Sequence, residues 1–203
     1  MENNINEKLP TPTKSKLKEF VESGWDLIKF ALIALVIVIP IRMWVAQPFV
    51  VSGESMFPTF DNGQYLIVDE ISYLLGKEHR GDVVIFKYPG DTKRFFIKRL
   101  IGLPNETIVV TDKDVTIINK DHPEGFKLNE PYVNEKPFIQ TGTYKTGDGE
   151  YFVMGDNRNR SSDSRTWAEP TALKLTNKLM VGRAYLRLLP INSISYLPGA
   201  HNQ

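Results

Sequence analysis

The chain has 203 residues, of which 41% are hydrophobic and 24% are charged, and its formal net charge is +1. The hydrophobic share argues against wholesale disorder, and the length accommodates one anchored domain with one core. The small net charge gives no electrostatic case for nucleic-acid binding. The absence of cysteine excludes disulfides, thiolate metal sites and a cysteine nucleophile.

An apolar segment, Trp25–Ala46, is predicted to be a transmembrane anchor. Its uninterrupted apolar run, Phe30–Ile41, falls short of the roughly 20 residues that a helix needs to cross a bilayer. Extension to Trp44 recovers the length and puts Lys29 and Arg42 near the two ends, where long cationic side chains can reach the interface. The flanking tryptophans stand where interfacial anchors belong.

The polar residues 1–24 are expected to form a cytoplasmic tail, because Lys14, Lys16 and Lys18 precede the anchor and favour an inside N-terminus. Residues 47–203 would then be extracytoplasmic, on a single-pass protein of the cell membrane. A cleaved signal peptide has the same outline, but no clean small-x-small site follows. A buried core helix is a further alternative, although the segment is not amphipathic.

Short segments rich in β-branched and aromatic residues follow the anchor, separated by Gly, Pro, Asn or Asp. The predicted strands are Gln64–Glu70, Asp82–Tyr88, Phe95–Gly102, Glu106–Thr111, Asp114–Asn119, Glu150–Met154 and Ala184–Pro190. The fold class is therefore mainly β, with an irregular antiparallel sheet or barrel-like domain behind one N-terminal transmembrane helix.

Three finer expectations concern the connections between these strands. A hairpin should turn around Asp112–Asp114. A helix is expected at Thr171–Leu179, and the polar, turn-rich residues 120–146 are interpreted as an inserted loop region.

Two segments place a polar side chain where chemistry is feasible. Ser55 lies in a segment with Gly53 and Pro58, which suggests a shaped turn, although a lone serine is commonly an ordinary turn residue. In the strand Phe95–Gly102, Lys98 and Arg99 point to opposite faces, so one cation must lie on the apolar side. The simplest alternative for this cation is a lysine at the rim of a sheet.

A third segment, Gly155–Arg165, is polar throughout after its glycine and follows a hydrophobic strand. So many hydrogen-bonding groups beside a core strand indicate a network of hydrogen bonds among side chains, in which Asp163 and Arg165 could pair. A fourth, Arg80–Pro89, is a charged turn leading into a buried strand and is more structural than chemical.

Together these segments resemble the bacterial type I signal peptidase family. The chain carries an N-terminal apolar span and then SGESMFPT, RGDVVIFKYP, IKRLIGLPNE and GDNRNRSSDSR, in the family's order and at similar spacing. The resemblance covers residues 25–190, and the short chain with one anchor is similar to the Gram-positive subgroup. It implies a Ser/Lys endopeptidase that removes N-terminal signal peptides from exported precursors.

The resemblance also implies roles for individual residues. Ser55 corresponds to the nucleophile and Lys98 to the general base, and Ser161 corresponds to the serine that orients the lysine. Asp163 and Arg165 match a supporting ion pair.

The chain departs from the family pattern at two places. Many Gram-negative members have an oxyanion-hole serine where this chain has Gly53, so the hole would rely on the Ser55 backbone N–H, helped by Ser52. After Arg165, TWAEPTALKL replaces the usual glycine-bearing continuation.

A serine hydroxyl needs a base to remove its proton, and the three histidines, His79, His122 and His201, do not accompany the serine motifs. Lysine can serve only when it is neutral, whereas its ordinary pKa of about 10.4 keeps it charged at pH 7. Burial lowers that pKa, and the apolar face that Lys98 shares with Phe96 would provide it.

The short connection from Trp44 to Ser55 places the nucleophile near the bilayer surface. Signal peptides hold their apolar region in the membrane and their cleavage site just outside it. The expected partners are signal-peptide-bearing precursors and the lipid bilayer. No nucleic acid, metal or other cofactor is expected, and the chain should be a monomer.

Other functions fit parts of the pattern. A penicillin-binding protein would use S-x-x-K at Ser15–Lys18 and K-T-G at Lys145–Gly147, but no S-D-N follows. A self-cleaving Ser/Lys repressor-type protease would need no membrane span. An anchored β domain that binds peptides or scaffolds partners leaves the Ser55, Lys98 and Ser161 pattern to chance.

Overall fold

The computed structural model describes residues 24–36, 47–74, 78–134, 136–167 and 173–197. The chain divides into two units, Met1–Arg42 and Met43–Gln203. In the first unit, residues 24–36 form a helix in which Lys29 pairs with Asp26 at 3.2 Å. Among the described residues no helix has the length and apolar character needed to cross a bilayer. Residues 1–23 and 37–46 of the predicted tail and anchor lie outside the described ranges, so the anchor stays a prediction.

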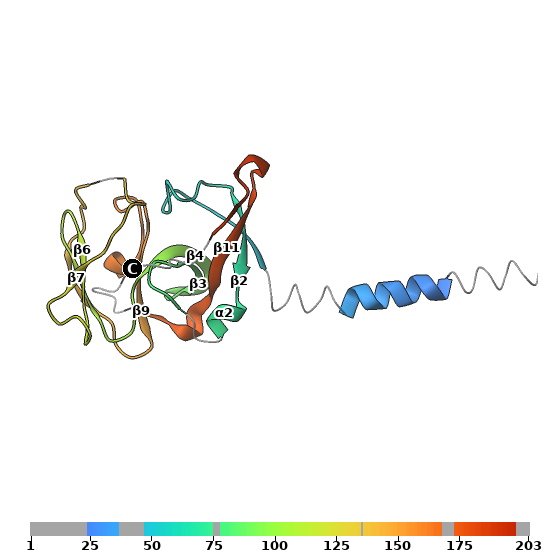
Figure 1. The fold of residues 1–203 in the computed structure, drawn as a ribbon, viewed down its shortest axis with the longest axis horizontal. Coiled ribbons are helices and arrows are strands. Elements are labelled where there is room, and N and C mark those ends of the chain that lie inside the picture. Colours follow the sequence, from blue (N-terminus) through green and yellow to red (C-terminus); the bar gives the residue numbers. More distant parts are fainter. Residues whose placement is uncertain (1–23, 37–46, 75–77, 135, 168–172, 198–203) are drawn as a thin grey trace, which may run out of the picture. The chain divides into compact units, whose positions relative to one another are not determined.

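The second unit is built from two antiparallel sheets (Figure 1). The larger sheet has eight strands, in the order β1-β2-β11-β3-β4-β9-β10, with β12 paired to β11. Its strands are β1 (Gln47–Val50), β2 (Tyr65–Asp69), β3 (Val83–Tyr88), β4 (Asp91–Gly102), β9 (Glu150–Met154), β10 (Leu175–Thr176), β11 (Met180–Leu189) and β12 (Ser195–Tyr196).

The smaller sheet has four strands in the order β7-β6-β5-β8. They are β5 (Thr107–Val110), β6 (Val115–Ile118), β7 (Phe126–Lys127) and β8 (Gly142–Lys145). Short helices complete the described chain: α2 (Ile71–Leu74), α3 (Ser164–Trp167), η2 (Asn177–Leu179) and η3 (Ile191–Ser193).

This architecture confirms the prediction of a mainly β, antiparallel fold, and register shifts in several strand pairs make the large sheet irregular. The described strands follow an open path from β1 to β10, however, and not the closed ring of a barrel. The predicted hairpin at Asp112–Asp114 joins β5 to β6.

Two of the finer expectations differ from the structure. The predicted helix over Thr171–Leu179 is wrong for its described part, where Leu175 and Thr176 pair with β9 as strand β10 and only a short turn of η2 follows. The side chain of Leu175 is buried in the core, so tertiary packing overrides the local helical preference. Residues 120–146 include β7 and β8, which complete the small sheet.

Strand β4 explains how the core positions the polar residues. It runs between β3 and β9, and its C-terminal half is buried. Lys98 lies opposite Val84 of β3, and Arg99 lies opposite both Val83 of β3 and Met154 of β9. Leu100 packs in one hydrophobic cluster and Ile101 in another, so both faces of the strand next to the two cations are covered by apolar residues.

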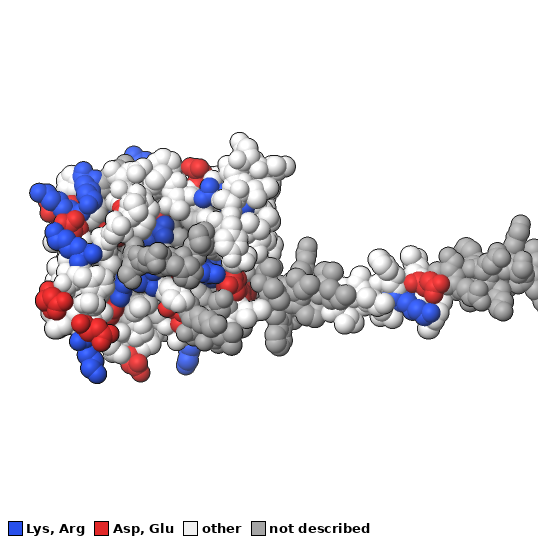
Figure 2. All heavy atoms as spheres, in the orientation of Figure 1, with Lys and Arg blue, Asp and Glu red and all other residues white. Residues whose placement is uncertain are grey.

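Charged side chains of both signs occur over the visible face of this unit (Figure 2). Some ion pairs of this unit are exposed, like Lys127–Asp114 at 3.1 Å, and such pairs contribute little to stability. Two ion pairs close to the site, Arg99–Asp156 and Arg165–Asp163, are instead buried.

Candidate active site

The serine turn lies between β1 and β2 and is closed by backbone hydrogen bonds. Val51 N–H donates to Gln64 O at 2.9 Å, and Gly63 N–H donates to Val51 O at 2.8 Å. Gly53 has φ of +93° and donates its N–H to Asn62 Oδ1 at 2.8 Å. Only glycine adopts this conformation without strain, so the residue that departs from the Gram-negative pattern shapes the turn that presents Ser55.

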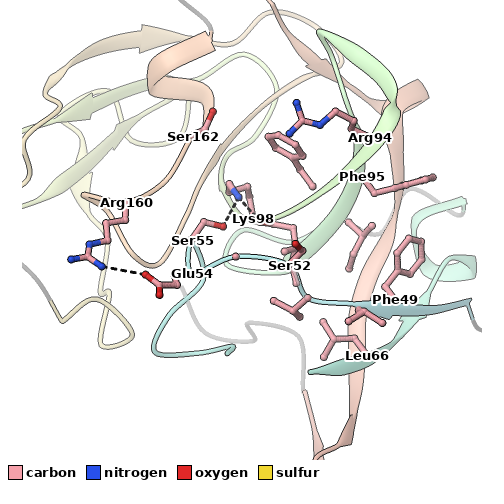
Figure 3. Close-up of a pocket in the computed structure, with 16 residues that line it drawn as sticks. Phe49, Ser52, Glu54, Ser55, Leu66, Arg94, Phe95, Lys98, Arg160 and Ser162 are labelled. Carbon is pink, nitrogen blue, oxygen red and sulfur yellow. Dashed lines mark hydrogen bonds and ion pairs between the residues drawn. The ribbon is translucent and has the colours of Figure 1, made fainter. Parts of the chain in front are cut away.

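The side chain of Lys98, on β4, contacts Ser55 in the serine turn. Its Nζ donates to Ser55 Oγ at 2.7 Å and to the backbone oxygen of Ile97 at 2.8 Å (Figure 3). The lysine is only 4% exposed, and its Nζ lies 5.3 Å from the centre of the Phe96 ring. The structure thus brings together the two residues that the sequence singled out.

Burial of Lys98 has an electrostatic consequence. Desolvation lowers the pKa of its ammonium to about 8, although the negative charges of Asp163 and Asp156 act in the opposite direction. With this pKa, about a tenth of the amine is neutral at pH 7, whereas an exposed lysine is neutral in fewer than about one molecule in a thousand.

The loop after β9 packs directly on the serine turn. Asn157 N–H donates to Ser55 O, and Asn157 Nδ2 donates to Glu54 O, both at 3.1 Å. A Cβ at Gly155 would overlap Ser55 O and Ser161 Oγ. Glycine is thus required for this close approach. The contact of the loop with the serine turn fixes the backbone of Ser55.

The expected supporting pair, Asp163 and Arg165, is formed and fully buried. Arg165 Nε donates to Asp163 Oδ1 and Arg165 Nη2 to Asp163 Oδ2, both at 2.8 Å. Asp163 Oδ2 also accepts the Gly155 N–H at 3.0 Å. The pair therefore holds the loop that supports Ser55.

The structure does not test the predicted roles of two other residues, Ser161 and Ser52. Ser161 Oγ is buried and has no hydrogen-bond partner among the described residues, so its hydrogen bond to Lys98 stays a prediction. Ser52 is exposed and lines the groove beside Ser55. Its contribution to an oxyanion hole also stays a prediction.

Sequence reasoning missed a second buried ion pair. Arg99 donates from Nε to Asp156 Oδ1 at 2.8 Å and from Nη2 to Asp156 Oδ2 at 2.6 Å. Thr59, in the serine turn, donates its hydroxyl to the same carboxylate. Alternation along β4 required one buried cation, but the structure buries both because Arg99 has its own carboxylate. The sequence feature that could have predicted this pair is Asp156 itself, an acidic residue in the polar segment after the hydrophobic strand.

Residues 120–146, which were interpreted as an inserted loop, also contact the buried arginines near the site. Arg158 forms a buried ion pair with Glu130, with one Nη1–Oε2 distance of 3.0 Å. The Arg99 guanidinium lies 3.8 Å from the centre of the Tyr132 ring. Glu130 and Tyr132 therefore contact Arg158 and Arg99 of the buried network.

Replacing Asp156 with asparagine should lower the free energy of unfolding by about 3 kcal/mol, because it leaves the buried Arg99 charge without a counter-ion. Chemical denaturation followed by circular dichroism measures the change. Asp114→Asn is the matched control, since Asp114 pairs with Lys127 on the surface and its loss should not be measurable. Equal stability of the two variants would show that the Arg99–Asp156 pair does not hold the turn.

A groove of ≈ 520 Å³ passes over Ser55 and Lys98. On one side of Ser55 its lining is mainly apolar, with Arg94 beside Phe95, and on the other side it carries Glu54 and Arg160 (Figure 3). In Figure 3, Phe49, Leu66 and Phe95 lie on the mainly apolar side. Val50, Ile85 and Ile97 also line the groove. The site can therefore receive an extended chain that passes the serine hydroxyl.

Comparisons with known proteins identify the family of the chain. The family model described as "Signal peptidase, peptidase S26" matches residues 24–189. A signal peptidase I of Bacillus amyloliquefaciens is 39% identical over 170 residues, which are 78% of this chain and 83% of the relative. One of Bacillus licheniformis is 38% identical over 194 residues, which are 90% and 97% of the two chains.

Among solved structures, a signal peptidase I from Enterococcus faecalis V583 is 29% identical and has a TM-score of 0.43, covering 53% of this chain and 96% of that chain. The family match and the Bacillus relatives span most of the sequence. The chain therefore belongs to the signal peptidase family, peptidase S26.

Proposed function

We propose that this chain is a signal peptidase I that cleaves N-terminal signal peptides from exported precursors, with Ser55 as nucleophile and Lys98 as general base. Family membership supports the reaction class. The observation that carries the assignment of residues is the 2.7 Å contact between Lys98 Nζ and Ser55 Oγ around a buried amine.

The first half of the reaction forms an acyl-enzyme. Neutral Lys98 accepts the Ser55 hydroxyl proton as the oxygen attacks the scissile carbonyl carbon. The Ser55 backbone N–H, which has no acceptor among the described residues, can donate to the developing oxyanion. The Lys98 ammonium then gives its proton to the leaving amine, and the C–N bond breaks.

The second half releases the signal peptide. Water attacks the ester carbonyl while Lys98, neutral again, accepts the water proton and later returns a proton to Ser55 Oγ. In this proposal Ser161 orients Lys98, the Asp163–Arg165 pair supports the loop, and Ser52 assists the oxyanion. The two ion-paired residues act through the Gly155 backbone and not on the substrate.

The proposal includes a membrane topology. Residues 25–46 anchor the chain as one transmembrane helix, residues 1–24 form a cytoplasmic tail, and residues 47–203 face outside as a monomeric catalytic domain. The tryptophans and cations at the ends of the apolar segment support this arrangement. A tethered site meets precursors at the bilayer at a high effective concentration.

Mapping the cleavage site tests the proposed function. The full chain in phospholipid vesicles is mixed with a precursor that has alanine at the first and third positions before the cut, and mass spectrometry identifies the new N-terminus. We expect one cut after the alanine, and a precursor with bulky residues at these positions should remain intact. Binding without cleavage would favour a peptide-binding scaffold.

The rate should depend on pH in the sense set by Lys98. Because burial lowers the pKa of this group to about 8 and only the neutral amine accepts a proton, kcat/KM should rise as pH increases through 8. Below this value it should fall about tenfold per pH unit. Initial rates between pH 6 and 9.5 measure the profile, and a profile that is flat from pH 6 to 9 would contradict the assignment.

A further inference from the structure

On the side of Ser55 away from Phe49 and Leu66, Glu54 and Arg160 line the groove as an exposed ion pair (Figure 3). Arg160 Nη1 lies 3.2 Å from Glu54 Oε2, with side-chain exposures of 71% and 66%. Glu54 precedes Ser55 in the chain, and Arg160 belongs to the loop that packs on the serine turn. Figure 3 shows both side chains on one side of Ser55, away from Phe49 and Leu66.

The chemistry of the two sides sets the direction of a bound chain. Signal peptides present small, apolar residues before the cut, and these match the mainly apolar side of the groove. An extended peptide advances about 3.3 Å per residue, so the first residues after the scissile bond pass Glu54 and Arg160 on the other side.

A second pocket lies next to the Glu54–Arg160 ion pair. It has a volume of ≈ 460 Å³ and shares Glu54 and Arg160 with the groove. Its walls include Phe57, which is 50% exposed, and Asn157, which also holds the serine turn. The space next to the ion pair is therefore open enough to accept side chains that follow the cut.

We propose that Glu54 and Arg160 form a subsite that binds charged side chains of either sign at the first two residues of the mature protein. This inference rests on the proposed function and adds a specificity that neither the family match nor the relatives' names contain. An acidic side chain receives hydrogen bonds from Arg160, and a basic side chain donates to Glu54. Because the pair is exposed and weak, either substrate charge can replace one partner, so the intact pair tolerates both.

Neutralising one partner at a time should produce opposite preferences. Glu54→Gln leaves Arg160 without its partner, and the ratio of kcat/KM for acidic over basic peptides should rise about 3- to 10-fold. Arg160→Gln leaves Glu54, and the same ratio should fall by a similar factor. Both side chains are exposed, so neither variant should disturb the fold.

The experiment uses the full chain in detergent micelles and peptides with one sequence before the cut. The peptides carry Asp, Asn or Lys at the first or the second residue after it. Asp114→Asn is the matched control, since it removes an exposed charge from the Lys127 pair on the small sheet and should keep the wild-type ratio. Charge preferences should also weaken as salt is added.

The outcomes separate the inference from the proposed function. Opposite shifts in the two variants support the subsite. Ser55-dependent cleavage with unchanged ratios, or with shifts of the same sign in both variants, overturns the subsite and leaves the peptidase assignment in place. Absence of any Ser55-dependent cleavage overturns the proposed function, and the subsite with it.

Discussion

Replacing Ser55 with alanine should lower kcat/KM for precursor cleavage by at least about 1,000-fold, because no hydroxyl remains to form the acyl-enzyme. The fold should survive, since the turn is held through the Ser55 backbone oxygen and through Asn157. Quantitative processing in vesicles measures the loss, and thermal unfolding checks that the protein is intact.

Ser195→Ala provides the matched control for this experiment. Ser195 is also partly buried, lies on β12, and is not part of the groove, so its alanine variant should cleave at the wild-type rate. A Ser55→Ala protein that keeps more than about a tenth of the wild-type activity would show that the nucleophile lies elsewhere.

Lys98→Met should reduce kcat/KM by about 1,000-fold or more while the free energy of unfolding stays unchanged or increases. Methionine has a similar length and fills the same apolar space, but it cannot accept a proton. It also removes the cost of burying an amine beside Phe96. Loss of activity without loss of stability distinguishes a base from a residue that only supports the fold.

Lys98→Arg should fail to restore activity, since a guanidinium stays protonated throughout the working pH range. Lys93→Met is the control on the same strand, because Lys93 is exposed at the other end of β4 and its replacement should leave cleavage intact. An active arginine variant would rule out Lys98 as the base.

Local patterns were sufficient for much of this molecule. Segments with β-branched and aromatic residues became strands β2 to β6, β9 and β11, because alternation and turn residues act over short distances. Ser55, Lys98, Asp163 and Arg165 were found from motifs. The contact between Lys98 and Ser55 joins segments 43 residues apart, whereas Asp163 and Arg165 pair locally within one loop.

Other features depend on contacts that no local pattern contains. Arg99 was expected to oppose Lys98, yet its partner Asp156 lies on a distant loop, and only the pairing of β4 with β9 brings them together. The strand β10 likewise forms because β9 offers an edge to Leu175. Pairings of this kind are set by the tertiary fold and override weak local preferences.

The rival interpretation as a penicillin-binding protein also depended on local motifs. Ser15–Lys18 lies outside the described residues, and Lys145 pairs with Thr107 at the edge of the small sheet. Family membership over residues 24–189 removes that reading. Motifs of three or four residues are weak alone, whereas several in a fixed order are specific.

The most direct test is the pKa of the Lys98 amine in the full-length protein. Carbon-13 labelling of lysine at Cε and titration by nuclear magnetic resonance, with Lys98→Met to assign the signal, would give this value. We expect a midpoint near 8, coincident with the rise in kcat/KM. A midpoint above about 10, the value of a hydrated lysine, would contradict a neutral amine poised against Ser55.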